Sequence, residues 1–304
     1  MVEYSIALAI AAACLFGTNA VIIQTGTREG SSVAAAVISS IVSVVAFWTL
    51  VYIRQPPLAD VTLLQLAPFF VAGIAYPALF RLFFFEGIAR TNASLSVVIK
   101  SVNPALAAIL AVVVLAERPE ATAVAGLVLI VVGVVGLQSM RTGDTLADGG
   151  QTDLLVRTLR TASVSDLLYP VMAMVIYVVG SIIIKYGLDR LGEPLIATAV
   201  TQTTGLVVFG VYLATSRTAR TRLTQCSPWA VGVFALSGVV VALAWLAQFF
   251  ALQLGTIVTV VPIFNISPLV VMGIAYVQAR ELPRSPTVIS AILLVLFGGI
   301  LIQI

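Results

Sequence analysis

The chain has 304 residues, of which 60% are hydrophobic and 10% are charged, and its mean hydropathy is +1.11. About a quarter of the residues of a typical soluble domain are charged, so this composition excludes an ordinary water-soluble fold. The net charge of +3 comes without a run of five Lys or Arg residues, which argues against a nucleic-acid partner, and the chain has no histidine, the usual general base and metal ligand.

Ten apolar segments follow one another, each of about the length of a membrane-spanning helix. We predict spans at residues 4–25, 32–53, 63–88, 93–115, 121–139, 166–188, 194–215, 229–253, 256–278 and 286–304. The first lacks the basic stretch of a signal peptide and is expected to be retained. A polar connector, residues 141–165, separates a five-helix unit at 1–140 from a second at 166–304. The sequence therefore predicts an all-α, polytopic membrane protein.

The two units share short motifs at a constant spacing. Pro104, Glu117 and Pro119 recur, at an offset of 164, as Pro268, Glu281 and Pro283. Because each unit has an odd number of spans, the second enters the membrane in the opposite direction, which gives two inverted repeats with a site near the midplane. The two glutamates close the fourth and ninth spans, and we interpret them as helix caps or interfacial anchors.

Several of these motifs resemble a known family. Phe16-Gly17-Thr18-Asn19-Ala20 in the first span, Asn103-Pro104 and Glu117-Arg118-Pro119 resemble the drug/metabolite transporter superfamily, EamA type, over nearly the whole chain. The resemblance implies a ten-helix secondary transporter of metabolites such as amino acids, nucleotide sugars or sugar phosphates. It also implies a central cavity lined by helices one, three, four, six, eight and nine. We expect a multi-pass protein of the plasma membrane.

Two basic residues lie within predicted spans, Arg81 in the third and Lys100 in the fourth. Each is about 13–15 Å from the short loop that joins the two helices, so they share a depth. A charge at mid-bilayer costs about 2.5 kcal/mol or more, and we expect both to bind an anionic group of a ligand. Alternatively, both side chains reach toward the interface near Glu86. The spacing of Ser96, Lys100 and Asn103 places them in one polar stripe, which favours the cavity.

The second unit has aromatic residues where the first has cations. At the offset of 164, Arg81 corresponds to Trp245 and Lys100 to Phe264. Such a cavity suits an amphiphilic anion or zwitterion. Taken alone, the two rings are better explained by core packing or lipid contact, and only the repeat makes them candidates for the site. Polar side chains within spans complete the candidate site, and each could instead bind a neighbouring helix. The predicted substrate-binding residues are Arg81, Lys100, Asn103, Asn19, Tyr76, Tyr177, Trp245, Gln248, Phe264 and Asn265.

Absent motifs narrow the function further. All 13 Asp and Glu residues fall in loops or near span ends, which argues against a proton-coupled exporter of cations. No phosphate-binding GxxxxGK[ST], HExxH or GxSxG motif occurs, so neither an ATPase nor an enzyme is expected, and no cofactor is expected. Cys14 lies in a span and Cys226 in a loop, which suggests neither a disulfide nor a metal site.

The leading hypothesis is a secondary active transporter that moves a small organic anion or zwitterion by alternating access, such as an amino acid or a phosphorylated or carboxylated metabolite. A flippase for lipid phosphates or lipid-linked head groups is the alternative, and an intramembrane enzyme is less favoured. The expected partners are a small-molecule substrate and the lipid bilayer, and no nucleic acid is expected. A homodimer is possible. The loops of one face carry ten cations against four on the other, which puts both termini outside, whereas the family resemblance implies termini in the cytoplasm.

Overall fold

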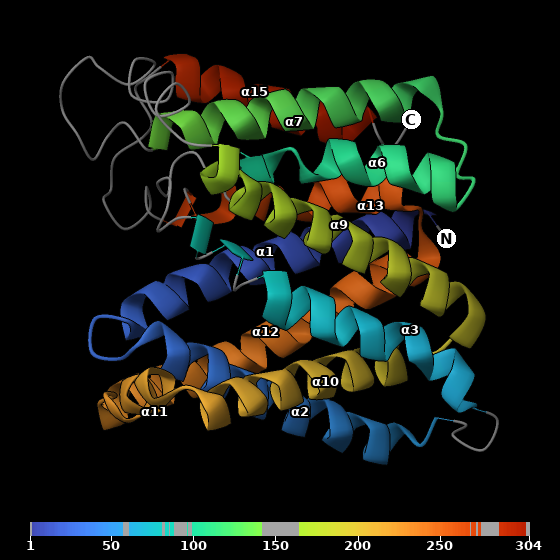
Figure 1. Ribbon diagram of the computed structural model, residues 1–304. Helices are drawn as coiled ribbons and strands as arrows, with labels where there is room; N and C mark the ends of the chain where they lie inside the picture. Colours follow the sequence, from blue (N-terminus) through green and yellow to red (C-terminus); the bar gives the residue numbers. More distant parts are fainter. Residues whose placement is uncertain are drawn as a thin grey trace.

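The architecture was analysed in a computed structural model, in which all regular secondary structure of the described residues is helical (Figure 1). The described residues are 2–56, 61–80, 83–84, 86–87, 96, 99–141, 164–267, 269–271, 273–274 and 286–301. Arg81, Pro268, Glu281 and Pro283 lie outside these ranges, so the expectations placed on them stay predictions.

Ten apolar helical segments occupy the positions of the ten predicted spans. Five are long and apolar enough to cross a membrane: α1 (Val2–Gly26), α2 (Ser32–Arg54), α9 (Val164–Leu191), α10 (Pro194–Thr215) and α12 (Pro228–Leu254). Five shorter apolar segments lie in the other helices of the described residues: α3 (Leu63–Gly73) with its π-helical continuation η1 (Ile74–Leu79), α6 (Asn103–Val114), α7 (Ala121–Arg141), α13 (Ile257–Phe264) and α15 (Pro286–Leu301). The predicted all-α, polytopic membrane fold is therefore confirmed.

One helix was not predicted. Residues between the seventh and eighth spans were expected to form a loop, but Arg217–Thr224 form α11. The helix begins where the Ser216 hydroxyl accepts a hydrogen bond from the Ala219 N–H, as an N-cap does. Tertiary contacts also stabilise α11: Ala219 is buried, and Leu223 packs against a small cluster of residues from α2 and α12.

The helices of the two units pack in matching pairs. α1 packs on α12 as α9 packs on α3, α2 packs on α12 as α10 packs on α3, and α1 packs on α13 as α9 packs on α6. In addition, α2, α6 and α7 each pack on their own counterparts, α10, α13 and α15. This pattern is that of a pseudo-two-fold axis between two repeats. Counterparts are five positions apart in the order of the spans, an odd number, so each helix runs opposite to its equivalent.

Glycines bring equivalent helices into close contact at equivalent places. A Cβ atom added at Gly73 in α3 would lie 2.6 Å from the carbonyl oxygen of Thr201 in α10. A Cβ atom added at Gly238 in α12 would lie 2.8 Å from the carbonyl oxygen of Ser39 in α2. Small residues allow backbones to approach in this way within a membrane, where apolar burial alone does not hold helices together.

The crossing of α7 and α15 gives a direct test of the repeat. Cβ atoms added at Gly133 and Gly298 would lie 2.8 Å and 2.7 Å from the carbonyl oxygens of Ala291 and Gly126. We expect Gly133→Ala and Gly298→Ala each to lower the free energy of unfolding by about 1–3 kcal/mol, because backbone must move to admit the methyl group. Thermal unfolding of the purified protein in detergent measures the loss.

Gly299 provides the matched control for that test. A Cβ atom added there meets nothing within 4 Å. Gly299→Ala should therefore leave stability unchanged or raise it by about 0.4–1 kcal/mol, since alanine restricts the unfolded chain and favours the helix. If Gly298→Ala and Gly299→Ala unfold at the same temperature, the two helices are not in close contact at Gly298.

The third, fourth and ninth spans depart from regular α-helix near the middle of the bundle. The third contains η1, the fourth has a turn at Val102 before α6, and the ninth has a turn at residues 265–266 after α13. Pro104 lies in the first turn of α6, where its missing N–H is tolerated because that group has no partner within the helix. Irregular backbone at membrane depth is found where it is buried in protein or lines a cavity.

The π-helix also accounts for a change in the spacing of the repeats. Equivalent residues differ by 165 at Gly73 and Gly238, before η1, and by 164 at Glu117 and Glu281, after it. A π-helical turn, with its i→i+5 hydrogen bond, holds one more residue than an α-helical turn. The third span therefore carries one residue more than the eighth beside the centre of the bundle.

Candidate functional site

A cavity of about 310 Å³ lies at the centre of the bundle, where the irregular segments meet. Seven of the ten predicted site residues line it: Asn19, Tyr76, Lys100, Tyr177, Trp245, Phe264 and Asn265. They come from spans one, three, four, six, eight and nine, the helices that the family resemblance implied. The repeat thus brings together side chains that are far apart in the sequence.

The other three predicted residues have different positions. Asn103 and Gln248 are buried but do not line the cavity, and the polar atoms of both amides have no hydrogen-bond partner among the described residues. Arg81 is outside the described residues. Direct contact of Asn103 or Gln248 with a ligand is therefore not supported by this geometry, and the pairing of Arg81 with Lys100 stays a prediction.

Aromatic rings form one continuous wall of the cavity. The ring centroid of Tyr76 lies 4.6 Å from that of Tyr177 and 4.8 Å from that of Trp245. Phe80 contacts Tyr177 at 5.5 Å, and Phe16 contacts Trp245 at 5.6 Å in an edge-to-face arrangement. Edge-to-face and offset pairs of this kind are the favourable geometries for aromatic side chains. The wall joins α1, the third span, α9 and α12.

Lys100 is the one formally charged residue among the described residues that line the cavity. Its Nζ atom lies 5.4 Å from the ring centroid of Phe80 and 5.5 Å from that of Phe84, within cation–π distance of both. Its equivalent in the second repeat, Phe264, lines the same cavity. The first repeat therefore supplies a cation where the second supplies a ring, as the offset of 164 predicts.

Polar side chains fix the remaining geometry. The Ser237 hydroxyl donates to Oδ1 of Asn19 at 2.7 Å, which orients that amide from α12. Nδ2 of Asn265 donates to the Val261 carbonyl at 2.8 Å. These contacts hold the two amide groups at defined positions around the cavity.

Sequence reasoning missed the part of the lining that α2 and α10 supply. Ser39, Ser40 and Ser43 of α2 and Gln202 of α10 line the cavity, so spans two and seven also contribute to it. Ser39 and Ser43 donate to carbonyl groups one turn earlier, which satisfies their hydroxyls within the helix. Three serines on one stretch of an otherwise apolar span were the available signal.

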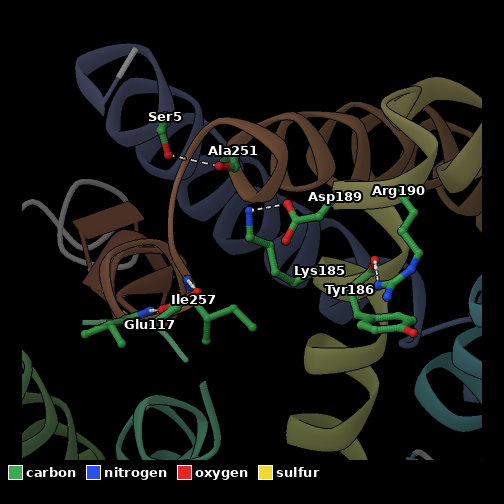
Figure 2. A network of polar contacts seen from close by, with 9 residues as sticks. Ser5, Glu117, Lys185, Tyr186, Asp189, Arg190, Ala251 and Ile257 are labelled. Carbon is green, nitrogen blue, oxygen red and sulfur yellow. Dashed lines mark hydrogen bonds and ion pairs between the residues drawn. The ribbon is translucent and has the colours of Figure 1, made fainter. Parts of the chain in front are cut away.

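Hydrogen bonds join the two repeats at one end of the bundle (Figure 2). We call this end, which carries Ser5, Glu117 and Ile257, the terminal face, because the N-terminus of the chain lies there (Figure 1). The Ser5 hydroxyl donates to the Ala251 carbonyl at 2.9 Å. The Glu117 carboxylate accepts from the N–H groups of Ile257 at 2.8 Å and Val258 at 3.2 Å. Glu117 thus caps α13, a helix of the other repeat, whereas Glu281 lies outside the described residues.

Inverted repeats with broken helices around a central cavity define the class of membrane transporters. The model of the EamA-like transporter family matches residues 4–138 and again residues 165–303, and the chain belongs to this family. Family membership makes it a membrane transporter rather than an enzyme, and the two matches agree with two repeats.

The comparison with solved structures gives matches to 28 chains. One of them, described as a crystal structure of a protein, is 14% identical to this chain and has a TM-score of 0.74. The alignment covers 98% of this chain and 97% of that chain. At this identity the similarity supports the fold and does not extend to a substrate. No curated protein matches the chain.

Proposed function

We propose that the protein is a secondary active transporter that moves a small organic anion or zwitterion by alternating access. The observation that carries this proposal is the position of Lys100, the one charge in the described lining of an otherwise aromatic and polar cavity. A cation in a membrane interior is costly and usually marks the path of a substrate or ion. An anionic group of the substrate would offset that cost when it binds.

The size and lining of the cavity limit the substrate. A volume of about 310 Å³ is at the lower end of the range for ligand sites. This favours a metabolite of amino-acid or sugar-phosphate size over a nucleotide sugar. The carboxylate or phosphate would lie at Lys100, and an apolar part would pack on the wall formed by Tyr76, Tyr177 and Trp245.

The irregular backbone beside Lys100 also favours an anionic substrate. α6 begins at Asn103, three residues after Lys100, with no side-chain cap on its first turn. The N-terminus of a helix carries a partial positive charge, which adds to the potential of the lysine. Discontinuous helices whose ends lie near the midplane are the usual binding elements of transporters with inverted repeats.

Counterflow into liposomes tests the proposal. Liposomes containing the purified protein are loaded with an unlabelled pool of amino acids, carboxylates or sugar phosphates, and entry of one labelled compound is followed. We expect a labelled anion or zwitterion to cross chemically unchanged, and a labelled organic cation to be excluded. Exchange of the cation alone would contradict the proposal, and movement of a fluorescent phospholipid between leaflets without counterflow would favour the flippase.

A further inference from the structure

We propose that the protein binds an anionic phospholipid in a second cavity, formed by α2, α10 and α11 at the end of the bundle opposite the terminal face. This proposal does not depend on the identity of the transported substrate. It rests on the level of α11 in the membrane, the exposure of its arginines and the shape of the cavity beside it.

Aromatic residues mark the level of α11. Tyr212, near the end of α10, is 39% exposed, and Trp229, in the first turn of α12, is 51% exposed. Exposed Tyr and Trp side chains near the ends of spans are typical of the boundary between hydrocarbon and head groups. α11 lies in the chain between these two residues, so its side chains are at the depth of the lipid phosphates.

α11 presents its cations outward at this level. Arg217, Arg220 and Arg222 are exposed, whereas Ala219 is buried against the bundle. The helix contains no acidic residue, and none of its arginines forms an ion pair with a described residue. The Ser31 hydroxyl donates to the Arg222 carbonyl at 2.6 Å, which ties the end of α11 to the start of α2. The backbone at the end of α11 is therefore held in place, and the exposed guanidinium groups can reach a phosphate.

The cavity beside α11 has a volume of about 340 Å³ and continues from Arg222 into an apolar cleft. Val33, Ala36 and Val37 of α2 line one side of it, and Val208 and Phe209 of α10 line the other. A phospholipid combines a phosphodiester with an acyl chain, which matches a cation at the rim and apolar walls behind it. Glu86 also lines the cavity, so the phosphate would stay at the rim beside Arg222.

The charge of α11 favours an anionic head group over a neutral one. Arg217, Arg220 and Arg222 lie on one short helix that contains no acidic residue. Basic pockets beside transmembrane helices are known binding sites for anionic head groups.

Native mass spectrometry of the full-length protein in detergent tests the proposal. Phosphatidylglycerol and phosphatidylcholine with identical acyl chains are added at equal concentrations, and the bound fraction of each is measured. We expect selective retention of phosphatidylglycerol. Arg222→Gln should weaken its binding about fivefold, as expected for one cation at a membrane surface. Arg54→Gln, which removes an exposed arginine at the terminal face, should leave it unchanged.

Two further variants test the cavity itself. Ala36→Phe fills the cleft without changing the charge, and should weaken binding, whereas Val45→Phe on the exposed side of α2 should not. Equal retention of the two lipids, or equal losses for Arg222→Gln and Arg54→Gln, would overturn the proposal. So would full competition by inorganic phosphate, which would assign the arginines to a free anion, or unchanged binding in Ala36→Phe.

Discussion

Lys100→Gln is expected to lower the rate of anion counterflow by about 10- to 100-fold at low substrate concentration. A hydrogen bond to a charged group contributes about 1.5–3 kcal/mol, which corresponds to that range of affinity. Glutamine is similar in length and keeps a donor, but it removes the positive charge from the described lining of the cavity. The affinity of the purified protein for its substrate, measured by thermal stabilisation, should fall in parallel with the counterflow rate.

The other lysine of the chain supplies the control. Lys185 in α9 makes an ion pair with Asp189 at 2.7 Å near the terminal face, away from the cavity. Lys185→Gln makes the same chemical change and should leave counterflow within about twofold, because an i,i+4 pair of this kind contributes about 0.3–0.5 kcal/mol. Lys100→Arg, which keeps the charge, should retain part of the activity. A normal rate in a stably folded Lys100→Gln variant would exclude the lysine from the site.

The spans and their pairing could be predicted because they follow from local properties. An apolar run of about 20 residues has to cross the bilayer as a helix, since only a helix satisfies its backbone there. Because Glu117 recurs as Glu281, the repeat could be recognised from the sequence alone. The repeat in turn placed Lys100 and Phe264, 164 residues apart, beside one cavity.

The features that could not be predicted depend on contacts between distant segments. Nothing in the local sequence Ile74–Leu79 specifies a π-helix, because Pro77 is compatible with several kinds of break. Gln202 is polar within an apolar span, but its position beside the cavity follows from the packing of α10 on α2 and α3. α11 is short and highly charged, and a helix of that length is not stable without the contact of Ala219 with the bundle.

The cap on α13 explains why a glutamate lies at the end of the fourth span. Ala116 adopts a left-handed backbone conformation, with φ of 55°, and this turns the chain at the end of α6. Glu117 then reaches the first turn of α13, where Ile257 and Val258 are almost completely buried and their N–H groups have no water to bind. A carboxylate at this position also interacts favourably with the positive end of the helix.

Glu117→Ala is therefore expected to destabilise the protein by about 2–5 kcal/mol. An unpaired buried N–H group costs about 1–3 kcal/mol, and this substitution leaves two such groups, those of Ile257 and Val258, without an acceptor. Glu117→Gln should cost roughly half as much, since its amide has one acceptor oxygen in place of two. Glu120→Ala, an exposed glutamate three residues further on, is the control and should be close to neutral. Thermal unfolding in detergent ranks the three variants.

The same contact joins the repeats at the terminal face, so its loss should also expose the start of α13. In a chain without Cys14 and Cys226, Ile257→Cys should therefore react faster with a water-soluble thiol reagent when it is combined with Glu117→Ala. Equal unfolding temperatures for Glu117→Ala and Glu120→Ala would mean that the carboxylate does not hold α13 in place.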